Sequence, residues 1–197
     1  MLFLSKCRLN TNKPVNPYEL HQMIWQLFPD RPDDSRDFLF RIENYGKPGP
    51  QIVYLQSQLQ PTPATGSLSI TDSKAFSPKL SEGQYLRFLV RANPTKRIND
   101  PKKTSNQGKV RVPLIDEGEM AAWLQRQFEN SATLSETIIS RHDRIYFRKK
   151  GRAGKIVSAV FQGILQVNDP LRLTEKLRDG IGPAKAFGCG LLSLARC

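Results

Sequence analysis

The order in which strand-like and helix-like segments follow one another constrains the fold of this 197-residue chain more than any other feature. Residues 2–9 have the two-residue periodicity of a strand. Asn16-Pro17-Tyr18-Glu19 then supplies an N-cap, a proline at the first helical position and a nearby carboxylate, which predicts a helix that runs to about Phe28. The other elements expected in the first half are strands at residues 37–43, 51–56 and 84–92, and a short helix between residues 61 and 81.

The second half roughly repeats this order after a polar, basic, proline-containing stretch at residues 93–108, which is typical of a linker or a mobile loop. A helix is expected after Asp116-x-x-Glu119, and a second one is expected between Asp169-Pro170 and Gly180. The predicted strands of this half are residues 134–139, 143–149, 155–167 and 188–194.

Two βαββαβ orders in one chain predict an α+β protein with two tandem ferredoxin-like domains. The N-terminal domain is expected to span residues 1–92 and the C-terminal domain residues 109–197. Residues 93–108 are expected to form a basic linker between them.

Positive charge is concentrated in two blocks, although the chain as a whole carries 30 Lys and Arg against 18 Asp and Glu. Residues 87–111 have a net charge of +7 and residues 141–155 one of +6, whereas residues 112–140 between them have a net charge of −4. This pattern favours a polyphosphate partner over the alternative, a pair of solvated loops. Membrane binding is disfavoured, because neither block lies on an amphipathic helix.

Several other classes of protein are excluded by composition. No apolar run approaches the roughly 20 residues that a transmembrane helix needs, and the N-terminus lacks the basic region of a secretory signal. Three cysteines and two histidines form no zinc or disulfide pattern, so we expect a cytoplasmic, reduced protein without metal or cofactor. The acidic run at residues 30–37 is interrupted by arginines and favours a turn over a two-metal site.

The first predicted helix carries a candidate for proton transfer. Tyr18, His21 and Trp25 share a face that lies away from the apolar stripe of Leu20, Met23, Ile24 and Leu27. An ordinary imidazole has a pKa near 6.5, which suits proton transfer at neutral pH. A structural or merely exposed histidine is the alternative for His21. Edge-of-core packing is the alternative for Tyr18 and the preferred interpretation for Trp25. His142 is expected to be a surface residue.

A glycine-rich segment lies near the C-terminus, where Gly180-Ile-Gly182 and Gly188-Cys-Gly190 flank Lys185. Glycine tolerates positive φ and allows the backbone to approach a phosphate closely. The segment is not a Walker or dinucleotide loop, because it lacks GK[ST] and follows a helix. Tight packing between helix and strand is the alternative explanation.

This segment resembles the glycine-rich motif of CRISPR repeat-processing endoribonucleases built from two ferredoxin-like (RAMP) domains. The resemblance to the CasE family, the processing subunit of the type I-E Cascade complex, runs in order from Met1 to the last strand. The segments that carry it, besides the opening strand, are Asn16-Pro17-Tyr18-Glu19-Leu20-His21, Asp37-Phe-Leu-Phe, Arg87-Phe-Leu-Val-Arg-Ala-Asn-Pro-Thr-Lys and Gly182-Pro-Ala-Lys-Ala-Phe-Gly-Cys-Gly-Leu-Leu-Ser.

The resemblance implies metal-independent cleavage of CRISPR precursor RNA at the 3′ base of the repeat stem-loop. The 2′-hydroxyl before the scissile phosphate would attack, leaving a 2′,3′-cyclic phosphate and a 5′-hydroxyl. The protein would stay on its product and join other Cascade subunits, and we expect it to be monomeric when isolated. A non-catalytic RNA-binding subunit and a protein–protein scaffold are the alternative functions.

The resemblance also implies roles for individual residues. His21 and Tyr18 correspond to the catalytic histidine and the helical tyrosine of the family, and Lys155 would stabilise charge near the cut. Gln22 stands where some relatives have an arginine, so the role of that arginine is not carried over. A basic β-hairpin at residues 144–155 would enter the major groove of the RNA stem. The residues expected to contact RNA are Arg91, Lys96, Arg97, Lys102, Lys103, Arg144, Arg148, Lys149, Lys150, Arg152, Gly182, Lys185, Gly188 and Gly190.

Overall fold

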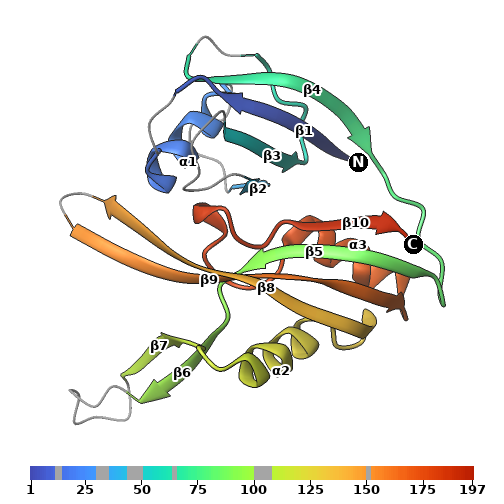
Figure 1. The fold of residues 1–197 in the computed structure, drawn as a ribbon. Helices are drawn as coiled ribbons and strands as arrows, with labels where there is room; N and C mark the ends of the chain where they lie inside the picture. Colours follow the sequence, from blue (N-terminus) through green and yellow to red (C-terminus); the bar gives the residue numbers. More distant parts are fainter. Residues whose placement is uncertain (12–14, 30–35, 44–50, 64–65, 100–107, 150–151) are drawn as a thin grey trace.

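Two four-stranded antiparallel sheets form the framework of the molecule (Figure 1). The computed structural model describes residues 1–11, 15–29, 36–43, 51–63, 66–99, 108–149 and 152–197. Its strands are β1 (Leu2–Leu9), β2 (Phe38–Ile42), β3 (Gln51–Ser57), β4 (Leu68–Phe76), β5 (Tyr85–Ala92), β6 (Thr95–Asn99), β7 (Lys109–Pro113), β8 (Ala132–Lys149), β9 (Arg152–Val167) and β10 (Leu192–Arg196). Its helices are α1 (Pro17–Trp25), α2 (Glu117–Phe128), α3 (Pro170–Asp179) and the 3₁₀-helix η1 (Lys185–Phe187).

The second sheet has the strand order β10-β5-β9-β8 and belongs to a complete βαββαβ unit. Along the chain this unit reads β5, α2, β8, β9, α3 and β10, with the hairpin of β6 and β7 inserted after β5. The first sheet has the equivalent order β2-β3-β1-β4. The predicted α+β class with two tandem ferredoxin-like units is therefore confirmed.

The short helix expected between residues 61 and 81 is absent from the described part of that segment. Residues 61–63 and 66–67 instead form a connection that leads from β3 to β4. Pro61 and Pro63 disfavour a helix there, because neither has an N–H to donate. The backbone N–H and the hydroxyl of Thr62 both donate to the carbonyl of Leu27, at 3.0 and 3.1 Å, which ties the connection to the end of α1.

The strand at residues 84–92 lies in a different sheet from the one predicted. β5 pairs with β9 and β10, not with the strands of the first sheet. The physical reason is that Leu86, Phe88 and Val90 alternate onto the core under α2 and α3. We therefore propose that the boundary between the two halves lies between β4 and β5.

The segment predicted as a linker contains a strand. Residues 95–99 pair with residues 109–113 as the antiparallel strands β6 and β7. Residues 100–107 lie outside the described residues. The two strands predicted at residues 134–139 and 143–149 form one long strand, β8, with irregular pairing at two points. The last strand begins at Leu192, after Gly188 and Gly190, both of which have positive φ.

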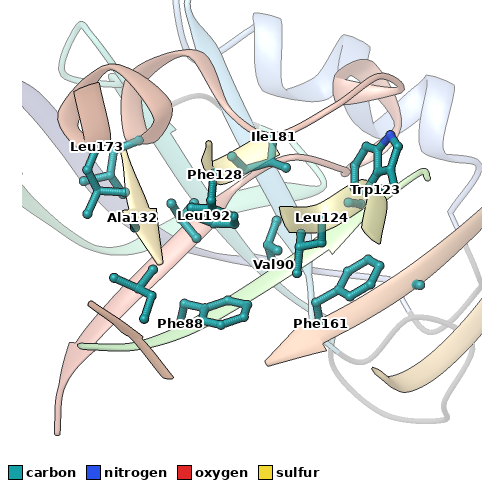
Figure 2. Close-up of a cluster of buried hydrophobic side chains, with 14 of the residues drawn as sticks. Phe88, Val90, Trp123, Leu124, Phe128, Ala132, Phe161, Leu173, Ile181 and Leu192 are labelled. Atoms are coloured by element: carbon teal, nitrogen blue, oxygen red, sulfur yellow. The ribbon is translucent and has the colours of Figure 1, made fainter. Parts of the chain in front are cut away.

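Each half has its own hydrophobic core. In the second half the core includes side chains of β5, α2, β8, β9, α3 and β10 (Figure 2). In the first half Leu20 and Ile24 of α1 are buried as predicted, and Met23 is partly buried. Leu27 is also buried but follows the end of the helix, which stops at Trp25 and not at about Phe28. The predicted cap of α1 is also present, because the Asn16 side chain accepts a hydrogen bond from the Tyr18 N–H at 3.1 Å.

The three cysteines are free thiols, two of them buried. Cys7 and Cys189 lie in the interior, whereas Cys197 is exposed. Burial raises the pKa of the Cys7 thiol to about 12, so this thiol stays protonated at neutral pH. Among the described residues, no helix combines the length and the apolar character needed to cross a bilayer.

Gly163 in β9 offers a test of this fold. A Cβ atom built on Gly163 would lie 1.9 Å from the carbonyl oxygen of Glu136, where the pairing of β8 and β9 is irregular. We expect Gly163→Ala to lower the free energy of unfolding by about 1–3 kcal/mol, because a backbone atom must move, and urea unfolding measures the loss. The control is Gly66→Ala, since the nearest atom to its new Cβ is 4.0 Å away. Equal losses would contradict the β8–β9 register.

Candidate functional site

His21 lies on α1 inside a group of aromatic rings. Its imidazole is half-buried, and its ring centroid lies 5.5 Å from that of Phe38, 6.2 Å from Trp25 and 6.5 Å from Phe40. Tyr18 lies one turn earlier on the same helix and is also half-buried. Trp25 packs at the edge of the first core, as predicted. Rings on α1 and β2 therefore fix where the imidazole can point.

The second half of the molecule reaches this group of rings at η1 and β8, both of which pack against α1. Phe147 of β8 and Phe187 of η1 lie in contact, with ring centroids 4.4 Å apart. A Cβ atom on Gly188 would lie 3.2 Å from Phe40, the ring that also neighbours His21. The predicted catalytic helix, hairpin and glycine-rich segment, which are far apart in sequence, are thus brought together.

The glycines of the C-terminal segment have positive φ, as expected: 76° at Gly180, 72° at Gly182, 80° at Gly188 and 95° at Gly190. The space that a Cβ would need is taken by protein atoms. A Cβ on Gly180 would lie 2.8 Å from Leu39, and one on Gly182 would lie 2.8 Å from Trp123. The packing explanation therefore accounts for these glycines, and contact between their backbone and RNA stays a prediction.

The described residues 144–149 and 152–155 form the end of the β8–β9 pair, as predicted. Tyr146 pairs with Lys155 and Phe147 with Gly154. Because successive side chains of a strand alternate, Lys155 lies on the exposed face with Arg144 and Tyr146, opposite the face that carries Phe147. The backbones of Arg148, Lys149 and Arg152 lie near the turn, while their side chains and all of Lys150 lie outside what the structure describes.

Arg91 was predicted to contact RNA at the surface, but it is buried in the structure. It lies on β5 and is only 4% exposed. Its carbonyl accepts a hydrogen bond from the Gly190 N–H at 2.7 Å. Arg91 is therefore a buried structural residue and not a surface cation.

The cations of the β6–β7 hairpin are exposed. Lys96 forms an ion pair with Glu119 of α2 at 2.7 Å, and Arg97 lies directly opposite Arg111 across the hairpin. Like charges in this register repel unless an anion lies between them. Lys109 and Arg111 share the face of Arg97 and were not among the predicted contacts. Lys102 and Lys103 lie outside the described residues.

Lys185 of η1 is half-buried, and its ammonium donates to the carbonyl of Asp179. Burial lowers the pKa of Lys185, and the positive charge of Arg36 lowers it further. Arg36 was missed by the sequence analysis as a neighbour of the site, and so were Phe38 and Phe40. The structure shows that all five residues of β2 are buried, the two phenylalanines among them. The sequence Asp37-Phe-Leu-Phe predicts a strand but does not show that both of its faces are covered.

Comparisons with known proteins agree on one family. The family profile described as "CRISPR associated protein" matches residues 2–196. The chain is 41% identical to the CRISPR system Cascade subunit CasE of Escherichia coli (strain K12), over 98% of this chain and 99% of that protein. It is 32% identical to the CRISPR-associated endoribonuclease Cse3 of Thermus thermophilus, over 92% and 90% of the two chains. A solved structure of endoribonuclease Cse3 bound to a 19-nt RNA superposes with a TM-score of 0.83 at 32% identity, covering 98% of this chain and 99% of that one.

A pair of glycine variants tests whether the glycine-rich segment positions the rings around His21. Gly83 and Gly188 have similar φ values of 77° and 80°, but only a Cβ on Gly188 would meet Phe40. Both alanine variants should lose about 1–2 kcal/mol of unfolding free energy from the positive φ alone. Only Gly188→Ala should also shift the NMR signals of the His21 ring. Unchanged His21 signals in Gly188→Ala would contradict the contact between this segment and β2.

Proposed function

The chain belongs to the CRISPR-associated family of CasE-type proteins, and from this premise we propose that it is an endoribonuclease that cuts CRISPR precursor RNA at the 3′ base of the repeat stem-loop. One observation carries the proposal. His21 lies where α1 meets η1 and β8, so an imidazole, a glycine-rich segment and a basic hairpin converge. Such a convergence suits an RNA strand that is held by one half of the protein and cut at the other.

The proposed reaction is an internal transesterification. The 2′-hydroxyl before the scissile phosphate passes its proton to solvent water and attacks the phosphorus, and the bond to the 5′-oxygen of the next nucleotide breaks. His21 gives its proton to that 5′-oxygen, so the products are a 2′,3′-cyclic phosphate and a 5′-hydroxyl. Tyr18 orients the attacking hydroxyl. The family resemblance gives Lys155 the role of stabilising charge on the phosphate oxygens, and no metal ion is required. In the structure Lys155 lies on the hairpin face opposite Phe147, the ring that packs on η1.

Binding in this proposal depends on the β8–β9 hairpin. Arg144 and Lys155 lie exposed on one face near its end, and Arg148, Lys149 and Arg152 follow at the turn. A-form RNA hides its major groove, so a hairpin can enter only at an open stem end. The product RNA stays bound, and with it the protein joins a Cascade-type complex, as the relative named Cascade subunit CasE indicates.

A non-catalytic RNA-binding subunit is the second candidate, because the aromatic packing of His21 would also suit a purely structural ring. The two functions differ in one measurable way. A binder retains repeat RNA without cutting it, whereas the enzyme cuts it with metal ions removed.

His21→Ala separates these candidates. In the presence of EDTA, the wild-type protein should cleave repeat RNA, and His21→Ala should be about 10²–10⁴-fold slower because the leaving oxygen is no longer protonated. Its affinity for the RNA should stay within about twofold. His142→Ala is the matched control and should cut at the wild-type rate. Cleavage is followed by gel electrophoresis, and the 2′,3′-cyclic phosphate is identified by mass spectrometry. Equal rates for His21→Ala and wild type would refute the assignment.

The hairpin is tested by the triple variant Arg148→Ala, Lys149→Ala, Arg152→Ala. The affinity for RNA should fall more than the cleavage rate of bound RNA. The magnitude of the slope of log affinity against log salt should fall by roughly two to three, because each phosphate contact contributes about 0.9 for a duplex. The matched control is Lys74→Ala, Lys79→Ala, Arg126→Ala, which removes the same charge from exposed positions elsewhere. If both triple variants change the slope equally, then net charge and not the hairpin governs binding.

A further inference from the structure

A cavity of about 250 Å³ lies where β2 meets the C-terminal end of α3 and η1. Three cations line it, Arg36, Arg178 and Lys185, together with the carboxylates of Asp37 and Asp179. This volume is large enough for one phosphate group. Its walls come from both halves of the molecule.

The guanidinium of Arg36 has a hydrogen-bond donor in this cavity that lacks an acceptor among the described residues. Within the part of the chain that the structure describes, its buried Nε has no hydrogen-bond partner. Burial also lowers the pKa of its guanidinium, which means that the charged form has lost hydration. A buried donor without an acceptor is unfavourable, and such groups commonly mark the place of a water or an ion.

Lys185 brings a second cation to the same cavity. Burial is the main cause of its lowered pKa, and the charge of Arg36 is the next. Two cations that repel each other are thus held together by the fold. The carboxylate of Asp179 opposes this effect, but it is already paired with Arg178 at 2.8 Å. The five charged groups leave a net charge of +1 for an incoming anion.

The cavity adjoins the proposed catalytic residue. Phe38 contributes to its lining, and the ring of Phe38 lies 5.5 Å from that of His21, centroid to centroid. A group bound between Arg36 and Lys185 would therefore be separated from the imidazole by the ring of Phe38. This is a separate location from the exposed face of the β8–β9 hairpin, where Arg144 and Lys155 lie.

We propose that this cavity is a phosphate-binding subsite in which Arg36 and Lys185 hold a phosphodiester of the RNA strand next to the cut. The guanidinium offers a planar fork to two phosphate oxygens, and the ammonium adds a point charge. The subsite would fix the strand relative to His21, and this part of the inference rests on the proposed endoribonuclease function. The anion chemistry itself does not, since inorganic phosphate would satisfy the same groups.

The first test uses inorganic phosphate without RNA. At constant ionic strength, phosphate should raise the Tm of the wild-type protein relative to chloride, because a ligand that binds only the folded state stabilises it. In Arg36→Gln the apparent affinity for phosphate should fall by about tenfold. Arg126→Gln, an exposed position on α2, should behave as wild type. An equal phosphate effect in Arg36→Gln would mean that the ion binds elsewhere, and would overturn the subsite.

The second test uses repeat RNA and separates this inference from the proposed function. The salt slope of RNA affinity should fall by about 0.7 in Arg36→Gln, the loss of one single-strand phosphate contact, and should not change in Arg126→Gln. If wild type cuts the RNA but the slope is unchanged in Arg36→Gln, the subsite is wrong and the function stands. If wild type neither binds nor cuts RNA while phosphate stabilisation still needs Arg36, the function is wrong and the cavity binds a free phosphate.

Lys185→Met provides a second variant in case Arg36→Gln does not fold. Methionine keeps much of the aliphatic stem but removes the charge, and the same losses of phosphate stabilisation and salt slope are expected. Circular dichroism and urea unfolding identify variants that retain the native structure. A folded Lys185→Met protein with wild-type phosphate and RNA behaviour would overturn the proposal on its own.

Discussion

The close approach of β2 to the glycine-rich segment is the constraint on which the site depends. Leu39 and Phe40 occupy the space that a side chain at Gly180 or Gly188 would need. Because packed protein interiors have few voids, an added Cβ at Gly180 would require atoms of Leu39 or Gly190 to move, and one at Gly188 would crowd the ring of Phe40. α1, which carries His21, packs against η1 and β8 at the same junction. The proposed chemistry is therefore a property of the junction between the halves and not of either half alone.

Buried polar contacts hold the same junction in one register. Arg41 of β2 is 7% exposed, and its guanidinium donates to the Ser193 hydroxyl of β10 at 2.8 Å while pairing with Glu43 at 2.8 Å. The Gln56 side chain donates to the carbonyl of Leu177 in α3 at 2.6 Å. A buried charge that loses its partner is costly, so sliding one half past the other would break these contacts without replacement. The apolar contact sets the distance between the halves, and the polar contacts set their alignment.

Local signals in the sequence predicted local structure well, because caps and periodicity act over a few residues. Asn16, Asp116 and Asp169 cap helices as expected, and the class of fold followed from the repeated order of elements. The sheet to which β5 belongs was not predictable in this way, because alternation identifies a strand but not its neighbours. Arg91 shows the same limit, since it shares a strand face with Arg87, which is exposed. Only the coverage of that face by the rest of the fold separates a buried arginine from a surface one.

The cations of the molecule are also of two kinds, exposed and partly buried. The net charge of +12 does not distinguish between them. Exposed cations such as Arg144 and Arg97 act through water, and salt screens them over about 8 Å at physiological ionic strength. They suit attraction of a polyanion and affinity for its backbone. Arg36 and Lys185 have already lost hydration on folding, so their interaction with an anion is shorter in range and more demanding in geometry. In the proposed reaction, in-line attack by a 2′-hydroxyl depends on the position of the strand more than on affinity, and cations held by the fold at the proposed subsite would fix that position.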